Sequence, residues 1–91
     1  MPVWKPAAVE DRRAIARYIA KDSPQAAVAV VDAVMEQAVQ LDANARMGRP
    51  GRVEGTREWV VHPNYVIVYR LIGAPEKVEI LRVLHARQQW P

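Results

Sequence analysis

The chain has 91 residues, of which 51% are hydrophobic and 25% are charged, so it has room for one compact core and is too apolar for a disordered chain. It has no cysteine, which excludes disulfides and thiolate metal sites, and no apolar run approaches the roughly 20 residues of a membrane span. The net charge is +3, but residues 45–91 hold eight Lys and Arg against four Asp and Glu, which favours an anionic partner for that half.

The chain opens with a short β-prone pair, Val3-Trp4, which predicts a brief edge strand. Pro6 should end this strand, because proline cannot donate a hydrogen bond to a ladder. Apolar side chains then recur at helical spacing, which predicts a first helix over residues 7–21. Two acidic side chains, Glu10 and Asp11, are expected in its first turn, where the helix dipole favours negative charge.

A second helix is predicted directly after the first. Ser23 suits the N-cap position and Pro24 the first helical position, where a missing N–H is harmless. An apolar stripe at helical spacing continues to Leu41, and the helix should end near residues 42–44. The connection between the helices is short, so they should form an antiparallel hairpin.

The second half of the chain is predicted to hold a loop and then three strands. Residues 47–52 contain two glycines and a proline, which should prevent any regular element. Runs of β-branched and aromatic residues predict strands at 57–62, 65–72 and 77–84, separated by short turns at Pro63-Asn64 and at 73–75.

Strict alternation in the last predicted strand puts Val78, Ile80, Arg82 and Leu84 on one face and Glu79, Leu81 and Val83 on the other. The element order is β-α-α-β-β-β. It predicts an α+β fold in which the helix hairpin packs on a small antiparallel sheet. We expect a single cytoplasmic domain over residues 1–91, with no cofactor and no metal site, because the chain lacks clustered ligands and a phosphate-binding glycine pattern.

Three stretches of the chain resemble one family. They are residues 48–58 (GRPGRVEGTRE), 65–70 (YVIVYR) and 83–91 (VLHARQQWP). In this order and spacing they are similar to the G-R-x-G-R-x-x-G-T-R-E, Y-x-I-x-Y-R and V-L-H-x-x-R-x-W-P segments of RelE/ParE-superfamily toxins. The family's N-terminal pattern is matched by Trp4, Ala8, Asp11, Ile15, Tyr18 and Ile19, and Arg12 stands where leucine is common.

The resemblance implies the toxin of a bacterial type II toxin–antitoxin system, held silent in a hetero-oligomer by a cognate antitoxin. It leaves two targets open, since a shared fold does not decide chemistry. RelE-like toxins cut messenger RNA on the ribosome, whereas ParE-like toxins are described as poisoning DNA gyrase without nuclease activity.

RNA cleavage needs a base for the 2′-hydroxyl proton, cations for the phosphate and an acid for the leaving oxygen. His85, Arg82, Arg70 and Arg87 are the candidate catalytic residues if the chain is a nuclease. Arg49, Arg52 and Arg57 are candidates for binding a target or RNA.

Two positions depart from the pattern of YoeB-type nucleases. Val66 stands where such toxins carry an arginine, and Ala86 follows His85 where they carry a tyrosine. These departures favour the gyrase-directed hypothesis over the alternative, a RelE-like ribosome-dependent endoribonuclease. A third hypothesis is a degenerate toxin that only binds its antitoxin.

Structural roles compete with these functional ones. Arg57 and Glu58 could form a cross-strand ion pair. Arg82 alternates with apolar residues and must find a carboxylate, a partner or solvent. Trp90 is expected to fold back onto the core, and His85 could be an ordinary hydrogen-bonding residue at a strand end.

Overall fold

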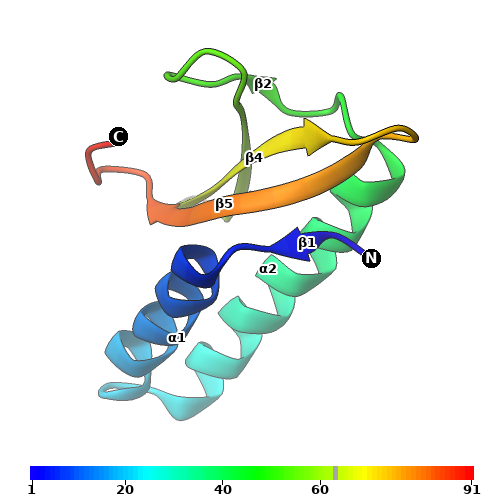
Figure 1. Ribbon diagram of the computed structural model, residues 1–91. Helices are drawn as coiled ribbons and strands as arrows, with labels where there is room; N and C mark the ends of the chain where they lie inside the picture. The colour runs from blue at the N-terminus through cyan, green and yellow to red at the C-terminus, as the bar shows by residue number, and fades with distance from the viewer. Residues whose placement is uncertain (63) are drawn as a thin grey trace.

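The computed structural model describes residues 1–62 and 64–91, so the turn expected at Pro63 lies outside the described residues. Two helices, α1 (Pro6–Ala20) and α2 (Pro24–Ala43), cover one side of a five-stranded sheet (Figure 1). The strand order is β1-β5-β4-β3-β2, and the bounds are β1 Val3–Trp4, β2 Arg49–Pro50, β3 Arg57–His62, β4 Tyr65–Ile72 and β5 Lys77–His85. The α+β class and the helix hairpin are as predicted.

The start of α2 confirms the predicted capping. The Ser23 hydroxyl accepts a hydrogen bond from the Ala26 N–H at 3.1 Å, and Pro24 occupies the first helical position. The prediction for α1 was wrong in one respect, because the helix begins at Pro6 and its first turn contains no acidic residue. Glu10 and Asp11 therefore lie beyond the turn in which the helix dipole acts.

Strands β3, β4 and β5 form the predicted antiparallel arrangement, and β1 makes the whole sheet mixed. Strand β1 pairs in parallel with β5, because α1 and α2 carry the chain across to the far edge before β3 begins. The segment expected to lack regular structure contributes β2, in which Arg49 pairs with Glu58 and Pro50 with Arg57. A proline is tolerated there because β2 is the edge strand and needs no outward N–H.

The last strand departs from strict alternation. Arg82 pairs with Val68 and Ile80 with the next residue of β4, Tyr69, so Leu81 is an extra residue in β5. Beyond this bulge the side chains change faces. Val83 therefore joins the buried core with Val78 and Ile80, and the predicted grouping of Arg82 and Leu84 with those two residues was wrong.

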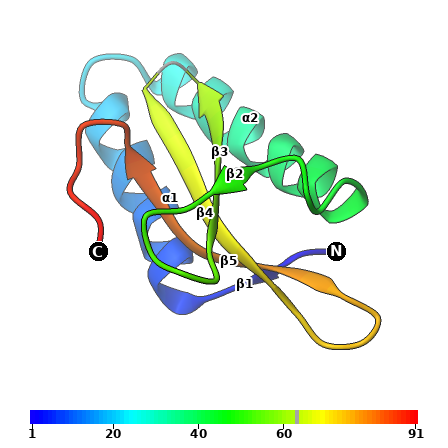
Figure 2. The ribbon, with the colours of Figure 1, turned by 90° about the horizontal axis from the view of Figure 1, so that it is seen from above.

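The two faces of the sheet are covered differently. On the helix face, the core joins side chains of both helices to Ile67, Tyr69 and their β5 partners. On the outer face, Val66, Val68 and Leu84 are also at most 3% exposed. The loop between β2 and β3 and the C-terminal tail both lie on this outer side (Figures 1 and 2). Neither helix of the described residues is long and apolar enough to cross a membrane.

Candidate functional site

The candidate catalytic residues and the candidate target-binding residues do not form one cluster. Cross-strand partners point to the same face of a sheet. Glu58 and Arg82 both pair with Val68 and so lie on the outer face, whereas Arg57 and His85 pair with residues of the helix face. The candidate cations are thus divided between two sides of the molecule.

A buried carboxylate organises two of the outer-face arginines. Glu58 is 2% exposed and accepts a hydrogen bond from the Arg52 backbone N–H at 2.9 Å. The guanidinium groups of Arg49 and Arg52 each lie 3.4 Å from one of its oxygens. Because neighbouring residues of a strand face opposite sides, the expected pairing of Glu58 with Arg57 was wrong.

The other outer-face arginines also have internal partners. Arg70 donates from Nε to the largely buried carboxylate of Glu79, its partner on β5. Arg82 makes a bidentate pair with Asp11 of α1, with distances of 2.7 and 2.8 Å. That hydrogen-bonded carboxylate raises the pKa of Arg82.

Asp11 also connects α1 to the sheet, since its carboxylate accepts the Val83 backbone N–H at 2.9 Å. The carboxylate thus pairs with a cation and also accepts a backbone N–H on the edge of β5. Trp90 folds back so that its ring centroid lies 5.8 Å from the guanidinium carbon of Arg82. The outer-face arginines are therefore held in the fold by Glu58, Glu79 and Asp11.

His85 belongs to a different environment. Its ring lies 5.6 Å from that of Tyr65 in an edge-to-face arrangement, beside a hollow formed with α1. The Nδ1 atom accepts the Arg87 backbone N–H at 3.1 Å, so in this geometry that lone pair is occupied. His85 pairs with Tyr65, which precedes Arg70 on β4 by five residues, a separation of roughly 17 Å along a strand.

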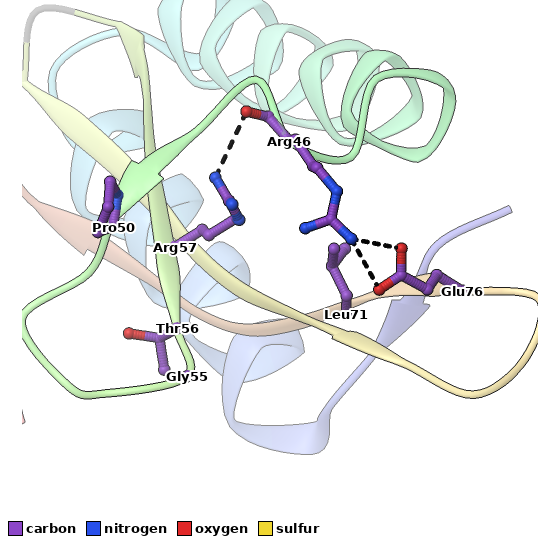
Figure 3. Close-up of a pocket in the computed structure, with 7 residues that line it drawn as sticks. All are labelled: Arg46, Pro50, Gly55, Thr56, Arg57, Leu71 and Glu76. Atoms are coloured by element: carbon purple, nitrogen blue, oxygen red, sulfur yellow. Dashed lines mark hydrogen bonds and ion pairs between the residues drawn. The ribbon is translucent and has the colours of Figure 1, made fainter.

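A second group of charged residues, not predicted from the sequence, surrounds Arg57. Arg57, Arg46 and Glu76 line a hollow of about 290 Å³ between the α2–β2 connection, β3 and the β4–β5 turn (Figure 3). Arg57 donates from Nη1 to the carbonyl oxygens of Gly48 at 2.6 Å and Arg46 at 3.4 Å. Arg46 donates from Nη2 to both carboxylate oxygens of Glu76 at 2.9 and 3.1 Å.

Tyr69 fixes the wall beside Arg57. Its hydroxyl accepts the Gly48 N–H and donates to the Ala45 carbonyl, both at 2.8 Å. Burial raises the pKa of Tyr69, so the hydroxyl stays neutral and keeps its proton for that second bond. A side chain at position 48 has no room, because an added Cβ would lie 2.5 Å from the tyrosine oxygen. Sequence alternation could have placed Tyr69 in the core, but nothing in the sequence pointed to Arg46 or Glu76.

Comparison with known proteins gives one consistent family. The family model described as "ParE toxin of type II toxin-antitoxin system, parDE" matches residues 3–90. A protein of Sinorhizobium fredii named "Putative toxin Y4kP" is 42% identical over 89 residues, which cover 97% of this chain and 90% of that relative.

Two solved structures share the fold. A chain of the chromosomal ParDE TA system from P. aeruginosa superposes with a TM-score of 0.78 at 29% identity, covering 93% of this chain and 95% of that one. The YoeB/ParE toxin from Agrobacterium tumefaciens superposes with a TM-score of 0.66 at 14% identity, covering 93% and 98%, which is a likeness of fold alone.

Proposed function

This chain belongs to the ParE toxin family of type II toxin–antitoxin systems, and from that membership we propose that it inhibits growth by binding DNA gyrase in the cytoplasm, without nuclease activity. The observation that carries the proposal is the separation of the groups that RNA cleavage would need. A base and several cations must converge on one phosphate for that reaction. Here His85 lies on the helix face, and Arg70 and Arg82 lie on the outer face.

The state of these groups supports the same conclusion. Arg70 is bound to Glu79 and Arg82 to Asp11, so binding a phosphate would leave a largely buried carboxylate without its cation. His85 has its Nδ1 lone pair engaged by the Arg87 N–H. Binding another protein through a surface does not require any of these side chains to leave its internal partner.

The test uses the purified toxin in two reactions. We expect it to inhibit DNA supercoiling by gyrase and to leave the message uncut in a translating ribosome extract analysed by primer extension. His85→Ala should inhibit gyrase as the unmodified toxin does. Intact supercoiling together with codon-positioned cuts that vanish in His85→Ala would disprove the gyrase proposal.

One observation favours the alternative, a ribosome-dependent endoribonuclease. His85 is exposed and lies beside Tyr65 and the exposed Arg87, so part of a catalytic set is present at that end of the sheet. In this case Arg87, whose backbone N–H contacts His85, would be the candidate cation, since Arg70 and Arg82 are held by Glu79 and Asp11. Arg87→Gln should then abolish the cuts in the ribosome extract, whereas Arg70→Gln should leave them.

The partner that neutralises the toxin is expected to cover the helix hairpin. A hollow of about 490 Å³ between α1 and α2 is almost entirely apolar, and Val28 at its rim is 61% exposed. Such a groove suits the apolar face of an amphipathic antitoxin segment. The small side chains of Ala16, Ala20 and Ala27 would let that segment approach closely.

Val28→Asp tests this placement, with Val39→Asp as the matched control, since Val39 is 51% exposed on the same helix but outside the groove. Bound antitoxin should raise the melting temperature of the control as it does that of the unmodified toxin. Val28→Asp should lose most of this increase. Equal stabilisation of both variants would place the antitoxin elsewhere.

A further inference from the structure

We propose that the hollow lined by Arg46, Arg57 and Glu76, here called the Arg46–Arg57 hollow, binds a carboxylate from an acidic segment of a partner protein. Glu76 occupies the carboxylate position beside Arg46 until the partner's carboxylate displaces it. Figure 3 shows the three side chains converging from the α2–β2 connection, β3 and the β4–β5 turn. The inference goes beyond the proposed function, because it does not depend on which target the toxin attacks.

The first argument is the charge of Arg57. Both hydrogen bonds that this side chain makes to the described residues go to neutral carbonyls, and no carboxylate of those residues forms an ion pair with it. The guanidinium is nevertheless fixed in orientation by the Gly48 carbonyl at 2.6 Å. Its Nε and Nη2 donors make no bond to the described residues. A preoriented cation with free donors binds an oxyanion at little cost in side-chain entropy.

The second argument is the ease with which Glu76 can be exchanged. The side chains of Arg46 and Glu76 are 65% and 49% exposed, and exposed pairs of this kind contribute at most about 1 kcal/mol. Arg46 holds both oxygens through Nη2 alone, instead of using the fork of two nitrogens that makes a strong bidentate pair. An incoming carboxylate that bridges Arg46 and Arg57 would therefore replace a weak pair with two charged contacts.

The third argument selects a protein carboxylate over a nucleic acid. The lining carries two cations and one anion, which leaves one net positive charge for one carboxylate. Pro50 and Leu71 add apolar surface that suits the methylene groups of a glutamate side chain. A nucleic-acid backbone needs a row of cations for successive phosphates, whereas the outer-face arginines belong to the opposite side of the sheet.

The experiment measures binding of a hexaglutamate peptide to the purified chain at low salt, by following the arginine Nε–H resonances. Arg57→Gln should weaken binding about tenfold or more, because a charged hydrogen bond is lost. Arg13→Gln, which removes the same charge from an exposed position on α1, should change the affinity by less than about twofold.

Glu76→Gln provides the second variant, and it leaves the bonds of Arg57 to the fold untouched. It should tighten peptide binding about threefold or more by removing the competing carboxylate. Glu36→Gln on α2 makes the same change in net charge at an exposed position and should have a smaller effect.

Three results would overturn the proposal. One is equal weakening by Arg57→Gln and Arg13→Gln, and another is equal tightening by Glu76→Gln and Glu36→Gln. The third is that inorganic phosphate or a single-stranded hexanucleotide shifts the Arg57 Nε–H resonance at lower concentration than the peptide does. That result would assign the hollow to phosphate groups instead.

Discussion

The outer face of the sheet and the Arg46–Arg57 hollow are both rich in arginine, but they differ in whether a carboxylate of the fold pairs with each arginine. On the outer face, Arg49 and Arg52 share the buried Glu58, and Arg82 has Asp11. In the hollow, Arg57 is held by carbonyl oxygens and has no carboxylate of the described residues as an ion-pair partner. The count of cations on a surface is therefore a poor guide to binding, because the position of the counter-charge decides which cations are available.

The largest expected effect tests whether the outer-face arginines are structural. Asp11→Ala should lower the free energy of unfolding by about 3 kcal/mol, because it leaves both the Arg82 guanidinium and the Val83 N–H without their partner. Urea denaturation measures the change. Asp22→Ala, an exposed acid between the helices, should stay within about 0.5 kcal/mol of the unmodified chain. Equal losses in the two variants would contradict a structural role for Arg82.

A smaller loss is expected from Glu58→Gln. The amide can replace only part of the three contacts that the carboxylate makes with Arg49 and Arg52, so the free energy of unfolding should fall by about 2 kcal/mol. The exposure of the two arginines limits the loss, because water can solvate them. Glu54→Gln, an exposed change in the same loop, is the control. A stability equal to that of this control would show that Glu58 does not organise the loop.

These counter-charges mark the limit of what the sequence could predict. Helical periodicity and capping residues are local signals, and they gave α1, α2 and three strands close to their observed bounds. The family resemblance is confirmed by the comparisons. Strand β2 was missed because its proline and the glycines on either side of it indicate a loop, whereas its pairing with β3 is a tertiary contact.

The candidate site was less predictable for the same reason. Arg82 was expected to find a carboxylate, a partner or solvent, but the sequence could not identify Asp11, which lies 71 positions away in the chain. The bulge at Leu81 also reversed the faces of the residues that follow it. The roles of His85, Arg70, Arg87 and the loop arginines stay predictions, since geometry places these residues without testing what they bind.

A third prediction concerns the wall of the hollow. Tyr69→Phe removes the hydroxyl that bonds to Gly48 and Ala45, so two buried backbone groups lose a partner. We expect a loss of about 1 kcal/mol in the free energy of unfolding, and weaker binding of the hexaglutamate peptide because Arg57 loses its fixed carbonyl. Tyr18→Phe, at a residue that is 72% exposed, is the matched control. Unchanged peptide binding in Tyr69→Phe would show that the Tyr69 hydroxyl does not position Arg57 for binding.

The smallest effect comes from an ion pair that belongs to neither region. The N-terminal ammonium of Met1 lies 2.9 Å from the Asp42 carboxylate, and this hydrogen-bonded contact holds the pKa of Asp42 below its usual value. A carboxyl whose pKa is lowered by folding contributes stability above its unfolded pKa of about 3.9, and loses it as the pH falls through the folded pKa.

Asp42→Asn should therefore be less stable than the unmodified chain at pH 6, by less than about 1 kcal/mol because the ammonium is exposed, and equally stable once the pH is well below 3.9. Thermal unfolding followed from pH 6 to pH 2 measures the difference. Acetylation of the N-terminus should reproduce the effect of the substitution, since it removes the cation. A difference that persists at pH 2 would mean that Asp42 acts through a contact that does not need its charge, unlike the carboxylates that hold the outer-face arginines.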